Sequence, residues 1–347
     1  MILTYSAPIF ADLVGTREVT LRDFQSVQLL FPPTRLKGRL SATPSREMSR
    51  LQMAIRKKLP LGVVLLAFGS LASAGQLTIP PAELVRQTVQ NETKAAGSSA
   101  HHMFISNRGT AHGSQTKLYC ETKDAMAGMA IAYDNKPLTP DQRTAEDGRL
   151  QGLINNPVEL AKKRKNERDD AERTTRIVRA MPDAMLYEYD GTEPGQQGLG
   201  KPGNELVRLK FRPNPKYDPP SHVEQVLQGM QGYLLIDANQ HRIARIDGTL
   251  FKDVGFGWGI LGHLDKGGHF LVEQADVGDG NWEIVHMALS FTGKILIFKH
   301  LDIRSNETFS DFQEVPNNLT FAQGVDLLKK QEAMLAQNRR NSVTHHQ

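Results

Sequence analysis

Residues 232–250, GYLLIDANQHRIARIDGTL, contain two apolar runs that are separated by a short polar segment. The segment begins at Asp237 and includes Asn239. Both residue types favour tight turns, because their side chains hydrogen-bond to the nearby backbone. Short apolar runs on both sides of such a turn predict a β-hairpin. We therefore expect antiparallel strands at Gly229–Asp237 and His241–Lys252.

The strand pattern recurs on both sides of this hairpin at short spacing. Glu205–Arg212 alternates, with Val207, Leu209 and Phe211 on one face and charged residues on the other. Strands and helices do not alternate regularly, so βαβ units are not expected. The sequence predicts a mainly β, α+β fold, in which a curved antiparallel half-open β-barrel of about ten strands packs on helices. Further strands are predicted at His102–Arg108, Gln115–Thr122, Ala125–Tyr133, Ala184–Tyr189, His269–Val277, Trp282–Phe291, Lys294–Ile303 and Glu307–Phe312.

Helical patterns accompany the strands in three places. The first helix is predicted at Pro81–Ala95, where prolines at the start and an early acid favour helix initiation. The second is a charged helical insertion at 138–182, which we expect Thr139 to cap. A third, polar helix around Phe321 closes the domain, and the tail at 337–347 is expected to be disordered.

The middle of the insertion is almost wholly polar. Nearly every residue from Lys162 to Arg176 is charged or polar, so we expect this helix to have no face to bury. Its support would come from the pairs Asp169–Arg173 and Glu172–Arg176, each contributing roughly 0.2–0.5 kcal/mol. Such a helix projects into solvent or bridges other elements. Its alternating charge is typical of a solvated face and does not favour nucleic-acid binding.

Residues 53–74 have the organisation of a Sec-type signal peptide. Arg56-Lys57-Lys58 forms the basic start, Leu59–Phe68 the apolar core, and Ala72-Ser73-Ala74 the small residues of a cleavage site. The apolar core is too short to cross a bilayer, which takes ~20 residues. We therefore expect secretion and no transmembrane segment in the mature chain.

The position of this signal is unusual, because signal peptides begin at the N-terminus. Met48 and Met53 both lie where a start would be expected. We therefore expect residues 1–52 to be a disordered extension outside the native product, and mass-spectrometric peptides from residues 21–39 would contradict this. The mature chain would begin at Gly75 rather than at a cysteine, so the expected product is periplasmic and is not a lipoprotein.

Removing the first 74 residues changes the charge of the chain. They hold ten of the 42 lysines and arginines but only four of the 38 acidic residues, so the formal net charge falls from +4 to −2. A nucleic-acid partner is therefore not expected, because phosphate binding needs a basic surface. Cys120 is the only cysteine, which excludes an intramolecular disulfide and favours a buried apolar thiol.

The later strands carry long apolar rows that have two interpretations. In the first, helices pack on one face of a curved sheet. In the second, the sheet covers an apolar cavity for a lipid or another small molecule. The glycine-rich segment Val254–Gly262 is likewise either an ordinary packed strand or a mobile apolar flap at the mouth of such a cavity. The residues expected to line the cavity are Val207, Leu209, Phe211, Phe256, Trp258, Val285, Met287, Leu289 and Phe291.

Nothing in the sequence predicts catalysis. The eleven histidines include no HExxH pattern, and the chain lacks CxxC and G-x-S-x-G motifs. Glu273, Asp276, Asp279 and Glu283 surround one hairpin, and we expect them to be exposed turn carboxylates. The protein is therefore expected not to be an enzyme and to need no cofactor and no metal.

The opening hairpin resembles that of periplasmic lipoprotein carriers of the LolA/LolB type. In that family a strand of the form Gly-x-apolar-apolar-Ile-Asp turns into a strand of the form apolar-x-Arg-Ile-x-Gly. The resemblance is strongest from Met230 to Phe312, and further upstream it consists of the order of signal peptide, helix and antiparallel strands. The inserted charged helices resemble a branch of uncharacterised bacterial envelope proteins. The matching residues are Gly232, Leu234, Leu235, Ile236, Asp237, Ile243, Arg245, Ile246 and Gly248.

The resemblance implies one LolA-like domain at 75–336, an incomplete barrel wrapped over helices with a cavity for acyl chains. The insertion at 138–182 is not part of the carrier pattern. One hypothesis is a periplasmic, non-enzymatic carrier of lipid or acylated, lipoprotein-like cargo. The other is an envelope structural or interaction module with a self-filled core, whose charged helical arm binds a partner protein. The expected partners are thus lipid or lipoprotein acyl chains, or an envelope protein.

Overall fold

The structure is a computed structural model that describes residues 79–97, 100–256, 262–295 and 299–344. The predicted extension at 1–52, the signal peptide at 53–74 and Trp258 lie outside the described residues.

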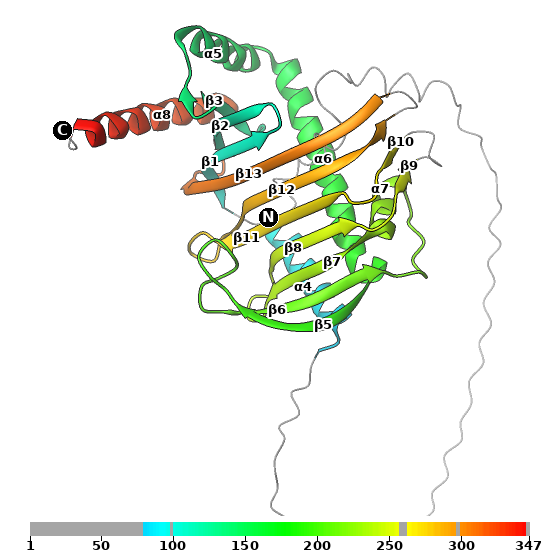
Figure 1. Cartoon of the computed structure of the whole chain (residues 1–347). Coiled ribbons are helices and arrows are strands. Elements are labelled where there is room, and N and C mark those ends of the chain that lie inside the picture. The colour runs from blue at the N-terminus through cyan, green and yellow to red at the C-terminus, as the bar shows by residue number, and fades with distance from the viewer. Residues whose placement is uncertain (1–78, 98–99, 257–261, 296–298, 345–347) are drawn as a thin grey trace, which may run out of the picture. The chain divides into compact units, whose positions relative to one another are not determined.

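The described strands form one curved, unclosed sheet in which every pairing between strands is antiparallel (Figure 1). This confirms the predicted mainly β, α+β class, although the sheet has thirteen strands rather than about ten. The strands are β1 His101–Thr110, β2 Gly113–Cys120, β3 Ala127–Tyr133, β4 Lys136–Pro137, β5 Met185–Pro194, β6 Glu205–Pro213, β7 Met230–Asp237, β8 Ile243–Leu250, β9 Val254–Phe256, β10 Gly262–Leu264, β11 His269–Asp276, β12 Trp282–Ile295 and β13 Lys299–Val315.

The order across the sheet brings the two ends of the domain together. It is β4-β3-β2-β1-β13-β12-β11-β8-β7-β6-β5, with β10 added at β12 and β9 paired to β10. The last strand, β13, therefore lies between the first strand, β1, and β12. The opening hairpin forms β7 and β8 at the expected place. The glycine-rich segment contributes β9 and β10, and the residues between them lie outside the described ranges.

The predicted division of the last strands is wrong. β12 continues to Ile295, and β13 is a single strand of 17 residues instead of the separate strands Lys294–Ile303 and Glu307–Phe312. The polar residues Ser305 and Asn306 lie in the gap between the two predicted strands. In the sheet Asn306 pairs with Gly109 of β1 on one side and with Ala288 of β12 on the other, so backbone pairing on both sides keeps the strand continuous.

The helices begin where local sequence favours helix initiation. Pro81 begins the first helix, as predicted. Thr139 caps the second through a capping box with Gln142. Asn156 ends that helix and caps the next by accepting hydrogen bonds from the N–H groups of Val158 and Glu159. The described helices are α4 Pro81–Ala96, α5 Pro140–Asn155, α6 Pro157–Ala184, α7 His222–Gln225, the short 3₁₀ helix η1 Val226–Gly229 and α8 Phe321–Thr344.

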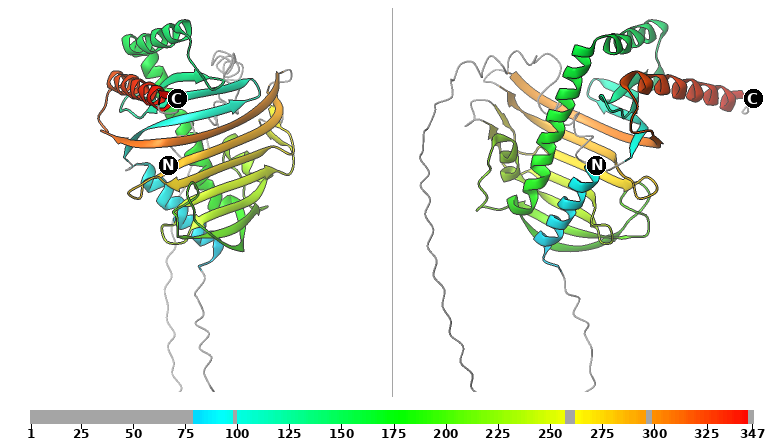
Figure 2. Two further views of the ribbon diagram at one scale, coloured as in Figure 1. Left: turned by 60° about the vertical axis from the view of Figure 1, so that its left-hand side comes forward. Right: turned by 180° about the vertical axis from the view of Figure 1, so that it is seen from behind.

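The expectation that the charged stretch Lys162–Arg176 has no face to bury is wrong, because Asp170 and Thr174 within it are buried. α6 crosses one face of the sheet beside α4 (Figure 2, right), and Val178 and Met181 near its C-terminal end are buried. The charged stretch ends just before these apolar residues. The expected pairs Asp169–Arg173 and Glu172–Arg176 are replaced by others, in which Arg173 contacts Asp170, Lys165 contacts Asp169 and Arg176 contacts Glu224. α6 therefore bridges α5 and the core.

Four apolar cores lie against the sheet, and the smallest of them consists of Leu199, Leu206, Leu235, Ala244 and Trp282. We call the face that carries Phe104 the inner face. Towards β6, β7 and β8 it packs against α4 and α6, and towards β11, β12, β13 and β1 it carries a second core. On the opposite face, β1, β2 and β3 pack against α5 and α8. α8 continues to Thr344, so the tail predicted to be disordered from Gln337 is helical through that residue.

Candidate functional site

Some of the predicted cavity residues form the core beneath α4 and α6. Leu209 and Phe211 on β6 are buried there, and Val207 on the same strand is half-buried and packs against it. Phe256 lies in β9, and its side chain is outside the described set, as is Trp258.

The other predicted cavity residues lie on β12. Met287, Leu289 and Phe291 are buried in the second core. Val285 is only half-buried, because the register between β11 and β12 shifts at this point and Ile284 takes the buried position. None of the predicted residues whose side chains the structure describes lines either of the two cavities described next, at the α6 helix.

The first cavity, which we call the α6 cleft, lies between α6 and the inner face at β1, β2 and β13. Its volume is about 280 Å³. Phe104 forms its floor with the rings of Tyr119 and Phe309, at centroid distances of 5.3 and 6.0 Å. The residues that line it are His101, Phe104, Tyr119, Glu121, Thr122, Lys123, Asp124, Ala125, Met126, Arg164, Glu167, Arg168, Ala171, Glu307 and Phe309.

α6 covers the cleft with one helical face. Arg164, Glu167, Arg168 and Ala171 follow the i, i+3, i+4, i+7 spacing that places side chains on one side of a helix. Glu167 fixes the helix to the sheet, because its Oε2 accepts the backbone N–H of Met126 at 3.0 Å. Its Oε1 lies 2.6 Å from Lys163 Nζ. The helix is thus held over the cleft by a specific polar contact.

Two buried carboxyl groups line the cleft. Glu121 and Glu307 are only 5% and 3% exposed. Glu121 accepts the backbone N–H of His102 at 2.7 Å, and Glu307 is 2.5 Å from the hydroxyl of Ser106. Burial raises the pKa of Glu307. Burial, followed by the nearby Glu283, raises the pKa of Glu121 to about 8. Glu121 is therefore largely uncharged at neutral pH.

A buried pair lies behind the cleft. His102 Nδ1 is 3.0 Å from Glu283 Oε1, within ion-pair distance although the two groups are not aligned as in an ideal hydrogen bond. Burial lowers the pKa of His102, but the contact with Glu283 and the negative charge of Glu283 outweigh this effect, so the pKa lies above its ordinary value. Each group of the pair thus compensates the burial of the other.

The expectation that four turn carboxylates are exposed is wrong for Glu283, which is completely buried, and for Asp276 and Glu273, whose side chains are 8% and 14% exposed. The turn between β11 and β12 ends at Asn281, so Glu283 already lies inside the sheet. Asp279 is exposed as expected. Asp276 forms an ion pair with Lys201 at 3.2 Å, and Glu273 bonds to Arg245 at 2.7 Å.

The sequence contains a signal for the cleft in the mixed composition of two strand faces. His102, Phe104 and Ser106 alternate along one face of β1, and Glu307 and Phe309 do so on β13. A strand face that mixes aromatic and polar residues in this way is unlike the uniformly apolar rows that we predict to line a cavity. Only the pairing of β1 with β13 shows that the two faces meet.

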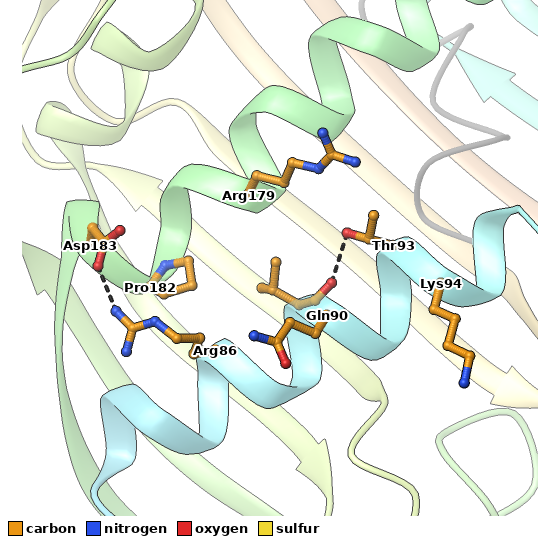
Figure 3. A pocket seen from close by; sticks show the side chains of 8 residues that line it. Arg86, Gln90, Thr93, Lys94, Arg179, Pro182 and Asp183 are labelled. Atoms are coloured by element: carbon orange, nitrogen blue, oxygen red, sulfur yellow. Dashed lines mark hydrogen bonds and ion pairs between the residues drawn. The ribbon is translucent and has the colours of Figure 1, made fainter.

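The second cavity is a groove of about 480 Å³ between α4 and α6 (Figure 3). Figure 3 shows Arg86 and Asp183 pointing toward each other across it, and their side chains are 2.6 Å apart. The rest of the lining is mainly polar, with Gln90, Thr93 and Arg179 among its residues. An apolar ligand therefore fits the α6 cleft better than this groove.

Among the described residues we find neither an evident metal site nor a reactive thiol. In the ranges that the structure describes, no group of three or more His, Cys, Asp or Glu residues could hold a metal ion. Cys120 is completely buried, and burial together with Glu121 raises its pKa to about 11. Its thiol therefore remains protonated at neutral pH and is a poor nucleophile.

Among residues 79–97, 100–256, 262–295 and 299–344, no helix combines the length and the apolar character that crossing a bilayer requires.

The comparisons with known proteins do not show a family for this chain. No family model matches the chain. No curated protein matches it either. Among solved structures, it is similar to a DUF1329 family protein from Desulfovibrio piger, with a TM-score of 0.27 and 9% sequence identity. The match covers 72% of this chain and 100% of that chain.

Proposed function

We propose that the protein is a non-enzymatic carrier that binds a lipid or the acyl chain of an acylated, lipoprotein-like cargo in the α6 cleft. The observation that supports this is the aromatic floor of Phe104, Tyr119 and Phe309 beneath a helix that Glu167 holds in place. Ligand sites are usually concave and mostly apolar, with a few placed polar groups. The resemblance of the β7–β8 hairpin to LolA/LolB-type carriers supports the same function.

The size of the cleft limits the cargo. Its volume of about 280 Å³ lies near the lower end of the ~300–1,000 Å³ that is usual for ligand sites. We therefore expect one acyl chain to be bound rather than several. The signal-like segment at 53–74 supports a periplasmic location for this activity.

The proposal is tested by blocking the cleft from the helix side. Ala171 lines the cleft, whereas Ala161 is exposed and does not, so the two alanines of α6 offer a matched pair. We expect the protein to bind a fluorescent fatty acid, Ala171→Trp to abolish binding, and Ala161→Trp to retain it. Lipid extraction of protein purified from the periplasm should also yield an amphiphile. No fatty-acid uptake and no co-purified amphiphile would rule the carrier out.

The alternative is an envelope interaction module with a self-filled core. Buried side chains favour this alternative, because they fill the space where a cavity was expected. These side chains are Leu209, Phe211, Met287 and Leu289. The exposed residues of α5 and of the N-terminal half of α6 would then contact a partner protein. Cross-linking from Val158, which is 75% exposed, would capture that partner in the periplasm even when the α6 cleft is blocked by Ala171→Trp.

A further inference from the structure

We propose that the α6 cleft selects an anionic amphiphile, whose carboxylate or phosphate is held at the mouth by Lys123, Arg164 and Arg168. This inference rests on the proposed function and names the chemical class of its ligand. It is carried by the position of these three side chains, by their lack of partners and by the aromatic floor of the cleft behind them.

The three cations approach the mouth from two elements. Arg164 and Arg168 are one turn apart on the face of α6 that covers the cleft. Lys123 lies opposite them in the connection from β2 to β3, where its backbone N–H donates to the carbonyl of Leu319 at 3.0 Å. All three residues are exposed and line the same cavity. An anion at the mouth would thus be contacted from both sides.

Among the described residues these three cations have no ion-pair partner, unlike other cations of α6. Lys163, Arg173 and Arg176 of α6 each form an ion pair with an acid. Within the part of the chain that the structure describes, neither Arg164 nor Arg168 forms an ion pair or a side-chain hydrogen bond, and the same is true of Lys123.

The acidic residues of the mouth have other partners. Asp124 accepts the backbone N–H of Phe321 at 2.9 Å. Glu167 accepts the backbone N–H of Met126 and contacts Lys163. Asp169 is near Arg168, but its carboxylate is bonded to Lys165. The mouth therefore presents guanidinium and ammonium groups that are free to bind a carboxylate or a phosphate, for which Arg is well suited.

The interior does not oppose an anionic ligand. Phe104, Tyr119 and Phe309 offer aromatic surface to an alkyl chain. Glu121 and Glu307 are buried, and burial disfavours their charged forms. A cationic amphiphile would gain less from carboxyl groups whose charged forms are disfavoured, and it would be repelled at the mouth. Charge thus selects the head group, while the aromatic floor binds the chain.

The test uses decyl probes with different head groups below their micelle concentrations, measured by calorimetry on the whole protein. We expect decyl phosphate to bind at least tenfold more tightly than decyltrimethylammonium, with decanol in between, and inorganic phosphate alone not to bind. The double variant Arg164→Gln, Arg168→Gln should weaken decyl phosphate at least tenfold and change decanol less than twofold. The control Lys162→Gln, Lys165→Gln removes two charges of α6 that do not line the cleft and should change neither.

The outcomes separate this inference from the function on which it rests. Equal affinities for the three decyl probes would overturn head-group selection and leave the carrier function standing. Failure of every decyl probe to bind would overturn both. Inorganic phosphate binding as tightly as decyl phosphate, with the same dependence on Arg164 and Arg168, would show a site for free anions and overturn the amphiphile.

Discussion

The imidazole Nδ1 of His102 on β1 lies 3.0 Å from a carboxylate oxygen of Glu283 on β12, and the two side chains are only 4% and 1% exposed. β13 separates these strands in the sheet, so the pair meets across it. Glu121, at the end of β2, accepts the backbone N–H of the same histidine. One imidazole thus lies close to the carboxyl groups of two glutamates, Glu283 and Glu121.

Removing the acid of this pair should destabilise the fold. Breaking a buried ion pair typically costs about 3–5 kcal/mol, because the remaining group is left without compensation. We therefore expect Glu283→Ala to lower the free energy of unfolding by about that amount in urea titrations. Asp279→Ala, on the exposed turn of the same hairpin, should change it by less than about 0.5 kcal/mol. Similar values for the two variants would contradict the buried pair.

The buried Glu121 should make stability depend on pH. Its folded-state pKa of about 8 exceeds the ordinary 4.5, so the folded state holds the proton more tightly than the unfolded state. This stabilisation is fully present below pH 4.5 and is lost as the pH rises to about 8. At about 1.4 kcal/mol per pH unit, the loss approaches ~4–5 kcal/mol.

The contribution of Glu121 can be separated from that of His102. The raised pKa of His102 acts in the same direction, because its stabilisation is also lost as the pH rises through the folded-state value. We expect Glu121→Gln to remove most of the difference in unfolding free energy between pH 5 and pH 8, leaving the smaller part due to His102. An unchanged difference in the variant would mean that Glu121 is ionised in the folded protein.

Local sequence was sufficient to predict much of the fold. The alternation in β6, the turn at Asp237 and the cap at Thr139 lie within a few residues of the structure that they determine. Hydrogen bonds of this kind depend on neighbours along the chain, so a single sequence contains the necessary information.

The candidate site could not be predicted in the same way. Glu283 and Asp279 are both acids beside one turn, and only the packing of β1 and β2 near the first of them makes it buried. Arg164 and Arg168 belong to a stretch that looks uniformly solvated, and their role depends on what lies opposite α6. Such information comes from contacts between residues that are far apart in the sequence.

The irregular register of β12 gives a direct test of the core. Strict alternation from Met287 would bury Val285, but the shift between β11 and β12 places Ile284 in the core, where it is 1% exposed. We expect Ile284→Ala to cost about 2–5 kcal/mol, as is usual for a buried isoleucine. Val285→Ala should cost about 1 kcal/mol or less. Thermal unfolding of both variants would measure these losses of stability. A larger loss for Val285→Ala would show that Val285, and not Ile284, occupies the core.

Gly232 and Gly248 should be intolerant of any side chain, because they pair directly across β7 and β8. A Cβ atom on Gly232 would lie 2.0 Å from the carbonyl oxygen of Asp247, and one on Gly248 would lie 2.4 Å from the ring of Phe270. The first clash is with backbone in the middle of the sheet, which cannot move without breaking strand pairing. The two glycines of the opening hairpin are therefore required by close packing.

We expect Gly232→Ala to lower the free energy of unfolding by about 3 kcal/mol, at the upper end of overpacking effects. Gly152 in α5 provides the matched control, since nothing lies within 4 Å of the position its Cβ would take. There the same substitution should stabilise the protein by roughly 0.5–1 kcal/mol, because alanine is the better helix former. Urea titration of the two variants should thus give shifts of opposite sign. A stabilising or neutral Gly232→Ala would show that β7 and β8 do not approach each other this closely.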